Sequence, residues 1–345
     1  MPLDEPFWWY GDGSQFMAGC LAPLAAVYGW GARRRYQRVT PYRSRLPVIC
    51  VGNLTAGGTG KTPLTLYLCA HLRAGGRYPA VLTRGYGGTH PGPHWVAEGD
   101  GADAVGDEAL LLARAAPTMV ERDRGAGART IELALESGAV AADVIVMDDG
   151  LQNPQLAKDL TLAVVDGTRG LGNGRVIPAG PLRAPLEFQL GLVDAIVVNA
   201  PPSGVGGAIA EWLGRRFAGP VLRCSTVAAG DTTWLKGRRV VAWAGIGAPR
   251  RYFGMLQALG AELIEAVAFS DHQRLSEADA RRLLGLAERG RATLVSTEKD
   301  MARLKGSTGA LAELAAATRP VPIELRFADA DGDRLAALIR NSLQS

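Results

Sequence analysis

The clearest candidate for chemistry in this sequence is a glycine-rich loop that ends in a lysine and a threonine. Its residues are Thr55-Ala56-Gly57-Gly58-Thr59-Gly60-Lys61-Thr62. Glycines let backbone N–H groups converge on phosphate oxygens, and the N-terminus of a following helix favours anions. In such a loop the lysine reaches the β- and γ-phosphates and the last hydroxyl binds magnesium. We therefore predict that residues 55–62 bind a nucleoside triphosphate, although threonine stands where such loops usually begin with glycine.

Two adjacent carboxylates form a second candidate. Asp148 and Asp149 follow the apolar run at residues 144–147, which has the composition of a buried strand. Ligands of parallel α/β sheets bind beyond the carboxyl ends of the strands, where carboxylates can hold magnesium or position water. The alternative is a polar turn before Gly150. Together with the phosphate loop, the pair favours a magnesium–nucleotide site.

Two further polar groups are ambiguous from the residues alone. Asp107 and Glu108 stand at the start of a predicted helix, where acidic residues often serve only as caps. His272 follows Asp271 after an apolar run that ends at Phe269. A single histidine is more often structural than catalytic, so both pairs keep a structural interpretation beside a chemical one.

These candidates need strands and helices to bring them together. Short apolar runs alternate with segments of helical pattern such as residues 62–74. The runs lie at residues 48–51, 80–83, 144–147, 160–165 and 195–198. Continuous apolar strands separated by helices indicate a parallel, doubly wound sheet. We predict an α/β fold of the P-loop NTPase type, with a parallel sheet sandwiched by helices.

A second series of such strands and helices begins near residue 239 and predicts a smaller α/β domain. A polar stretch at residues 224–231 is the best candidate for the boundary. The predicted organisation is an N-terminal membrane-interfacial segment, a P-loop nucleotide-binding domain and a C-terminal α/β domain; the family resemblance described below implies that the second is a kinase domain and that the third closes the cleft. These span residues 1–46, 47–225 and 226–345.

The N-terminal segment has its own composition. An aromatic cluster at residues 7–10 precedes an apolar stretch at 16–32, and four arginines follow within residues 33–38. The apolar stretch is shorter than the roughly 20 residues that span a bilayer. Acidic residues near the N-terminus argue against a secretory signal. The segment is either a helix packed on the protein or an interfacial helix, with tryptophans at headgroup depth and arginines on anionic lipid.

The overall composition excludes several classes of protein. The chain has 345 residues, of which 47% are hydrophobic and 21% charged, so wholesale disorder and a polytopic membrane protein are excluded. The net charge of +4 gives little reason to expect a nucleic-acid partner. Four cysteines without a C-x-x-C pair fit a reducing, cytosolic compartment.

Several motifs together resemble the tetraacyldisaccharide 4′-kinase family, the lipid A 4′-kinases. The phosphate loop with its prefix, residues 51–63, is similar to that of the family, and the resemblance covers nearly the whole chain. The other matching segments are Thr83-Arg84-Gly85-Tyr86-Gly87-Gly88, Gly106-Asp107-Glu108, Asp148-Asp149-Gly150-Leu151-Gln152, residues 174–183, Ala244-Gly245-Ile246-Gly247-Ala248-Pro249, Phe269-Ser270-Asp271-His272 and Thr297-Glu298-Lys299-Asp300.

The resemblance implies transfer of the ATP γ-phosphate to the 4′-hydroxyl of tetraacyldisaccharide 1-phosphate, the lipid A disaccharide, which forms lipid IVA. It implies ATP and Mg²⁺ as cofactors and two α/β/α domains with a cleft between them. It also implies a peripheral location on the cytoplasmic face of the bacterial inner membrane. We expect a monomer that contacts an anionic membrane surface through residues 7–38 and binds no nucleic acid.

The resemblance also implies roles for individual residues. Asp107 would accept the proton of the hydroxyl, His272 would orient or tune it, and Lys61 and Asp149 would complete the catalytic group. Thr62, Asp148 and Glu108 are the predicted metal ligands. The predicted substrate-binding residues are Arg84, Gln152 and Arg183.

Two positions depart from the family pattern. Asn153 stands where the family usually has histidine, and Ala184 where it usually has glutamate, with Glu187 three residues later. If either family residue has a direct role, this chain performs that role differently.

Three other functions remain as alternatives. A membrane-associated P-loop ATPase switch of the partitioning type shares the loop but carries a signature lysine at the position of Thr55. A GTP-binding switch would need an N-K-x-D motif, which is absent, since Glu298-Lys299-Asp300 does not have this pattern. A non-catalytic lipid-binding module would need no magnesium site.

Overall fold

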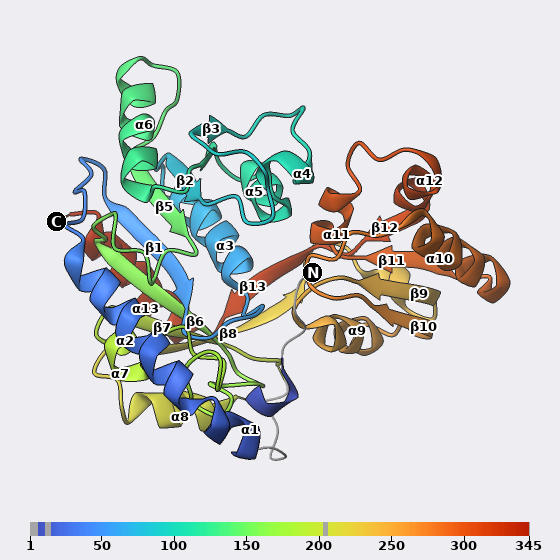
Figure 1. Ribbon diagram of the computed structural model, residues 1–345. Helices are drawn as coiled ribbons and strands as arrows, with labels where there is room; N and C mark the ends of the chain where they lie inside the picture. The colour runs from blue at the N-terminus through green and yellow to red at the C-terminus, as the bar shows by residue number, and fades with distance from the viewer. Residues whose placement is uncertain (1–5, 11–14, 203–205, 345) are drawn as a thin grey trace.

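A computed structural model describes residues 6–10, 15–202 and 206–344, which form a larger and a smaller α/β unit (Figure 1). Within these residues the larger sheet has the strand order β13-β8-β7-β6-β1-β5-β2-β4-β3. All neighbours are parallel except the pairs β13–β8 and β3–β4 at the two edges. The bounds are β1 Val48–Asn53, β2 Pro79–Thr83, β3 His94–Trp95, β4 Thr118–Val120, β5 Val144–Asp148, β6 Leu160–Asp166, β7 Ala195–Asn199, β8 Val221–Ala228 and β13 Ile323–Phe327. The predicted parallel sheet is confirmed.

Helices cover both faces of this sheet, which explains why the central strands have continuous apolar sequences. Every residue of β1, β5, β6 and β7 is buried. Successive side chains point to opposite faces, so Ile49 packs with α3, α5 and α13, and Cys50 packs with α6. Helices α7 and α8 cover the remainder of the second face. The bounds are α3 Lys61–Ala74, α4 Ala102–Val105, α5 Asp107–Ala113, α6 Arg124–Glu136, α7 Leu186–Leu190, α8 Gly207–Gly214 and α13 Asp329–Ser342.

The smaller unit contains a parallel sheet with the order β10-β9-β11-β12. Tyr252 and Leu256 of α9 pack on one face, and Leu283 of α10 and Leu314 of α12 pack on the other. Helix α11 follows β11 and faces the larger unit. The bounds are η2 Thr233–Leu235, β9 Arg239–Ala244, α9 Pro249–Ala258, β10 Glu262–Ala268, α10 Glu277–Gly290, β11 Thr293–Ser296, α11 Glu298–Arg303, α12 Gly309–Ala317 and β12 Thr318–Pro320.

The chain returns to the larger unit before it ends. Strand β13 pairs antiparallel with β8, with Phe327 opposite Cys224. Leu335 and Ile339 of α13 pack into the core of the larger sheet. The assignment of all of residues 226–345 to a C-terminal domain is therefore wrong for the last segment. The apolar face of α13 is buried against strands that lie far away in the sequence, and local pattern does not reveal such a partner.

The N-terminal segment begins with η1 (Phe7–Trp9), and its tryptophans are held by the protein. The indole N–H groups of Trp8 and Trp9 both donate to the carbonyl oxygen of Pro178, over 3.3 and 3.2 Å. The Trp9 side chain is buried. The interpretation that places the tryptophans at headgroup depth is therefore wrong for Trp9, because this side chain packs on the protein.

Helices α1 (Gln15–Cys20) and α2 (Ala22–Arg38) bury their small residues and expose their large apolar ones. Ala25 and Gly29 face the protein, and a Cβ on Gly29 would lie 3.2 Å from the ring of Pro185. The side chains of Phe16, Leu24, Val27 and Trp30 are 79%, 61%, 67% and 62% exposed. Among the described residues, no helix combines the length and apolar character that crossing a bilayer requires.

Candidate functional site

The phosphate loop connects β1 to α3, as the sequence predicts. Gly60 precedes the helix with a φ of +100°, a conformation that favours glycine. Two asparagines that the sequence analysis did not identify support the loop from the ends of β1 and β7. The Nδ2 of Asn53 donates to the Gly57 carbonyl over 3.2 Å, and the Nδ2 of Asn199 donates to the Thr59 carbonyl over 3.5 Å. The loop backbone is thus shaped by strand ends on both sides.

The loop is in direct backbone contact with the smaller unit. A Cβ on Gly247, in the turn between β9 and α9, would lie 2.7 Å from the Cα of Gly58. Beside this contact, Arg251 donates to the carbonyl oxygen of Asn199 over 2.7 Å and lies 3.5 Å from the Asp166 carboxylate. The two units therefore meet at the nucleotide loop itself.

Asp149 holds the two cations nearest to the loop. Its Oδ1 lies 3.7 Å from the Nζ of Lys61 and accepts a 2.7 Å hydrogen bond from Arg183. Burial alone would raise the pKa of Asp149, but the charges of Lys61, Arg183 and Arg84 lower it below its usual value. Asp149 is thus kept ionised and orients Lys61. Its φ of +49° is a conformation that non-glycine residues rarely adopt.

Asp148 lies at the end of β5 and is fully buried. Its Oδ1 accepts a 3.0 Å hydrogen bond from Thr65, in the second turn of α3. Burial and the nearby charges of Glu108 and Asp149 raise the pKa of Asp148 to about 7. A divalent cation beside Asp148 would relieve this crowding of negative charge, so the site fits Mg²⁺ electrostatically.

The predicted metal ligands are not equally available. Glu108 forms a 3.0 Å ion pair with Lys299. Thr62 lies in the first turn of α3, directly after the loop lysine. Among the described residues no group of three or more histidine, cysteine or acidic side chains forms a ready cation site. Mg²⁺ often binds through one or two protein ligands with phosphate oxygens and water completing its shell, which Asp148 and Thr62 could provide.

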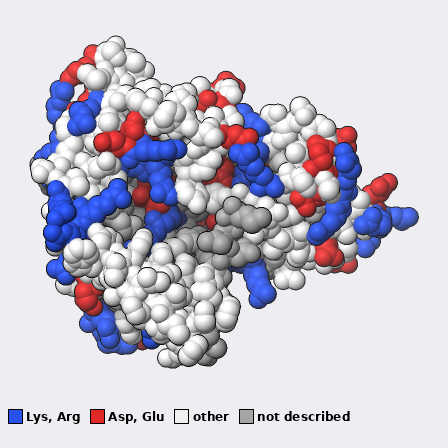
Figure 2. Space-filling model, viewed as in Figure 1, with Lys and Arg blue, Asp and Glu red and all other residues white. Residues whose placement is uncertain are grey.

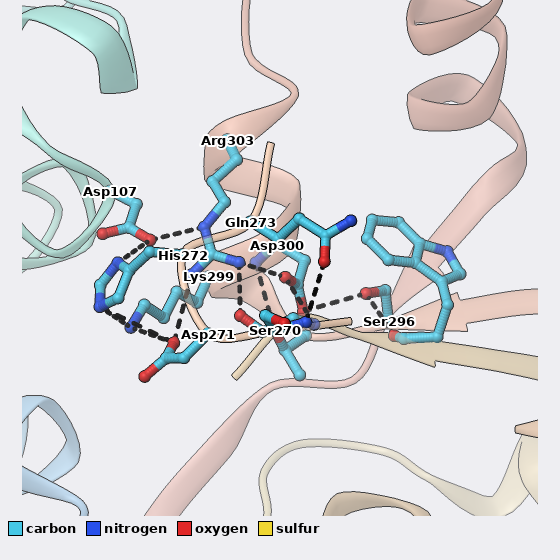
Figure 3. A network of polar contacts seen from close by, with 12 residues as sticks. Asp107, Ser270, Asp271, His272, Gln273, Ser296, Lys299, Asp300 and Arg303 are labelled. Carbon is cyan, nitrogen blue, oxygen red and sulfur yellow. Dashed lines mark hydrogen bonds and ion pairs between the residues drawn. The ribbon is translucent and has the colours of Figure 1, made fainter. Parts of the chain in front are cut away.

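Asp107 and His272 come together across the cleft between the units (Figure 3). The Nδ1 of His272 lies 3.2 Å from the Oδ2 of Asp107, and Arg303 donates to the same oxygen over 2.6 Å. Burial would raise the pKa of Asp107, but the hydrogen bond from His272 and the charges of Lys299 and Arg303 hold it well below the usual value. His272 has a φ of +60°, and such backbone strain is often found at functional sites. The contact implied by the family resemblance is present.

A cavity of about 190 Å³ opens beside this pair. Tyr86 and Gly106 line it from the larger unit, and Phe269, Gln273 and Leu304 line it from the smaller unit. The Tyr86 ring stands edge-on to the His272 ring, with their centres 5.0 Å apart. The cavity thus has walls from both units and the acid–histidine pair at its side.

The three predicted substrate-binding residues lie in different surroundings. Arg84 is exposed, with its guanidinium 4.7 Å from the centre of the Tyr86 ring. Arg183 donates to Asp149 and to the Thr55 carbonyl. The Nε2 of Gln152 donates within the protein, to the carbonyl oxygen of Asn53. Of the three, Arg84 is the one most open to a ligand.

The two departures from the family pattern have structural accounts. Asn153 closes a turn, because its Oδ1 accepts from the backbone N–H of Gln155 over 2.8 Å. Lys158 supports the same turn by donating to the carbonyl oxygen of Asn153 over 2.7 Å. Ala184 is buried, and Glu187 is exposed in the first turn of α7.

Two charged residues of α11, Lys299 and Arg303, also belong to the site, although the sequence analysis did not assign them to it. Lys299 lies 3.4 Å from the Nε2 of His272, and Arg303 contacts Asp107. Lys299 stands in the Thr297-Glu298-Lys299-Asp300 segment that resembles the family, which was the one available signal. Arg303 lies outside that segment, in a sequence typical of an ordinary charged helix.

A phosphate loop with buried carboxylates beside it and a histidine reaching them from a second unit is an arrangement that serves phosphoryl transfer. This arrangement places the chain among the P-loop phosphotransferases. The sequence profile of the family described as tetraacyldisaccharide-1-P 4′-kinase (LpxK) matches residues 17–344. The chain therefore belongs to the tetraacyldisaccharide 4′-kinase family.

Individual relatives agree over almost the full length. The tetraacyldisaccharide 4′-kinase of Nitrobacter winogradskyi is 45% identical over 95% of this chain and 94% of its own. That of Methylorubrum extorquens strain PA1 is 48% identical over 94% of this chain and 97% of its own. Among solved structures, LpxK from Aquifex aeolicus in complex with ATP superposes with a TM-score of 0.70. The superposition covers 95% of this chain and all of the other at 23% identity, which supports the fold.

Proposed function

We propose that this protein transfers the γ-phosphate of ATP to the 4′-hydroxyl of tetraacyldisaccharide 1-phosphate, forming lipid IVA and ADP. The observation that carries the proposal is the meeting of the two units at one site. The phosphate loop contacts the turn at Gly247, and Asp107 contacts His272 across the same cleft. A partitioning-type ATPase would need a signature lysine at the position of Thr55. Both halves of the site come from one chain, and we expect a monomer.

The larger unit would bind and polarise the nucleotide. Backbone N–H groups of residues 55–62 would surround the phosphates, and Lys61, oriented by Asp149, would balance charge on the transferred group. Asp148 and Thr62 would hold Mg²⁺, which when bound supplies positive charge to the β- and γ-phosphate oxygens. In support of this proposal, the loop follows the carboxyl end of β1, and Asp148 and Asp149 lie at the carboxyl end of β5.

The Asp107–His272 pair would handle the proton of the acceptor hydroxyl. The proton leaves the 4′-oxygen as this oxygen forms its bond to phosphorus and the bond to ADP breaks. Asp107 is ionised and can accept a hydrogen bond from the hydroxyl, but its low pKa makes it a weak base on its own. We propose that Asp107 takes up the proton and that His272 orients and tunes the Asp107 carboxylate by donating to it through the 3.2 Å contact.

The helices α1 and α2 would hold the enzyme on the cytoplasmic face of the inner membrane. Figure 2 shows mostly uncharged side chains over the lower part of the molecule, where these helices lie in Figure 1. Arg33, Arg34 and Arg35 are exposed in the last turns of α2. An apolar surface next to arginines suits an anionic lipid surface, where each arginine adds roughly 1 kcal/mol.

The reaction is tested with radiolabelled ATP and tetraacyldisaccharide 1-phosphate. Label in the lipid product supports the proposal. Release of free labelled phosphate without labelled lipid would favour an ATPase switch instead.

The membrane surface is tested by flotation with anionic vesicles. Replacing Phe16, Leu24 and Trp30 with serine is expected to weaken binding, and raising salt is expected to weaken it further. Leu133→Ser on α6 is the matched control, because Leu133 is 63% exposed and lies on another helix. Equal flotation of the triple variant and the control would mean that α1 and α2 do not face the lipid.

A further inference from the structure

Helix α11 of the smaller unit presents two cations to the start of α5 in the larger unit. Lys299 and Arg303 are four residues apart and therefore lie on one face of the helix. Their side chains are only 15% and 12% exposed. Figure 3 shows both pointing toward Asp107 and His272. Long cationic side chains are rarely buried unless each makes specific contacts, so these contacts indicate what the two residues do.

Arg303 fixes the orientation of Asp107. Its Nε donates to the Oδ2 of Asp107 over 2.6 Å, while its Nη1 donates to the carbonyl oxygen of Gly245 and to Asp300 over 2.6 and 2.7 Å. The guanidinium is therefore held in place by the smaller unit before it reaches across the cleft. Within the described part of the chain, the other oxygen of Asp107 accepts a hydrogen bond from the backbone N–H of Glu108, over 2.8 Å. A carboxylate oxygen can accept two bonds, so this oxygen can still receive a hydroxyl.

Lys299 fixes the state of the His272 ring. Its ammonium group lies 3.4 Å from the Nε2 of His272 and can only donate to it. Nε2 must then present its lone pair, so the ring proton is on Nδ1, which faces the Oδ2 of Asp107 at 3.2 Å. The ammonium is itself held by Glu108 at 3.0 Å and by Asp271 at 3.4 Å.

We propose that Lys299 and Arg303 are positioning residues for the proposed kinase reaction. Arg303 aims the Asp107 carboxylate at the acceptor hydroxyl, and Lys299 sets the tautomer in which His272 donates to Asp107. This inference rests on the proposed function only for its kinetic consequence. The tautomer itself can be measured without substrate.

A nearby ion pair provides a control that distinguishes a positioning role of α11 from a role in simply holding the two units together. Arg114 of α5 and Glu298 of α11 also join these helices, with 3.5 Å between Nη1 and Oε1. Their side chains are 55% and 36% exposed, so this pair lies at the surface, unlike the buried contacts of Lys299 and Arg303. If α11 only held the units together, removing Arg114 and removing Arg303 would have similar consequences.

The kinetic test compares Arg303→Met with Arg114→Met in the full-length enzyme. We expect Arg303→Met to lower kcat on the order of 100-fold, comparable to loss of general-base assistance. We expect the KM for ATP to change by less than about threefold, since ground-state binding of nucleotide is not affected. Arg303→Lys should recover little, because a lysine cannot reproduce the directed donors of a guanidinium. Arg114→Met should keep nearly full activity.

A double variant tests whether Arg303 acts through Asp107. Adding Arg303→Met to Asp107→Asn should cause little further loss, because the residue that Arg303 aims has already been neutralised. Full multiplication of the two losses, or equal losses in Arg303→Met and Arg114→Met, would overturn the role of Arg303.

The second test reads the histidine ring directly by NMR on protein labelled with ¹⁵N-histidine. The chain has only four histidines, which makes assignment practicable. We expect the wild-type His272 ring to be in the tautomer with its proton on Nδ1, the nitrogen that faces Asp107. In Lys299→Met, the ring should no longer be confined to this tautomer, because the ammonium no longer occupies the Nε2 lone pair and the Asp271 carboxylate lies 3.7 Å from Nε2 as a possible acceptor.

A wild-type ring protonated on Nε2, or an unchanged ring in Lys299→Met, would overturn the role of Lys299. If the lipid substrate is not phosphorylated but the ring behaves as expected, the proposed function fails while the positioning contact stands. If the lipid is phosphorylated but the ring does not change, the positioning role of Lys299 fails alone.

Discussion

The two halves of the site are built in different ways. The phosphate loop is eight contiguous residues between one strand and one helix of the larger unit. The acid–base cluster joins Asp107 to His272, 165 residues later, and to Arg303, 196 residues later. The loop is thus complete in one unit, whereas the cluster exists only when both units are in place. Nucleotide binding and proton transfer should therefore respond differently to changes at the interface between the units.

The largest effect is expected from the loop itself. Lys61→Ala should lower kcat by at least about 10³-fold, because Lys61 balances charge that develops on the transferred phosphoryl group. The fold should survive, since this side chain extends toward Asp149 and is not part of a hydrophobic core. Labelled lipid product and thermal melting measure the two outcomes. Lys236→Ala, an exposed lysine of the smaller unit, is the control, and near-normal turnover in Lys61→Ala would refute the loop assignment.

The acid–base pair should show losses that do not add. Asp107→Ala and His272→Ala should each lower kcat by about 10²–10⁴-fold, the usual range for general-base catalysis, with small effects on the KM for ATP. The double variant should be little worse than the poorer single variant, because a coupled pair acts as one unit. Steady-state kinetics of the three variants decide this. Fully multiplicative losses would indicate independent roles and would remove the link between the residues.

The backbone contact between the loop and the smaller unit gives a third, smaller effect. Gly247→Ala would place a methyl group 2.7 Å from Gly58 and must displace one of the two backbones. We expect kcat/KM to fall on the order of 10–100-fold, as small misplacements of reacting groups do. Gly254→Ala on α9 is the control, since its added methyl group meets nothing within 4 Å. Equal activity of the two variants would show that this contact is not needed during turnover.

The smallest effect is the change in thermal stability caused by Asp148→Asn, which should stabilise the nucleotide-free protein while it abolishes activity. Burial, Glu108 and Asp149 raise the pKa of Asp148 to about 7, so between about pH 4 and pH 7 the folded state binds a proton that the unfolded state has lost. The stability contributed by protonated Asp148 is therefore lost as pH rises through this window. Asp148→Asn should raise the Tm of the nucleotide-free protein at pH 8 and much less at pH 5, although the variant should be inactive. A Tm gain independent of pH would contradict this account.

Sequence alone predicts the parts of the molecule whose pattern is local. The loop, the buried strand before Asp148 and the parallel sheet follow from composition and spacing. Helix α6 begins at Arg124, earlier than its apolar pattern suggests, because the Asp123 side chain caps it by accepting from the N–H of Ala126. Other contacts join residues that are far apart in the sequence. Trp9 bonds to Pro178, 169 positions later, and Asp107 bonds to Arg303, 196 positions later, and no local sequence pattern encodes such contacts.

The course of the chain between the two units has a practical consequence. The smaller unit leaves the larger sheet after β8 and returns through β13, and these strands are hydrogen-bonded neighbours in which Ile323 lies opposite Ala228. The entry and exit points are therefore separated by only about 5 Å, the spacing of paired antiparallel residues. A short Asn-Gly turn joining these two positions would make β8 and β13 an ordinary hairpin. The smaller unit is thus an insertion at one edge of the sheet, and this edge is where the nucleotide-binding half could be separated and studied on its own.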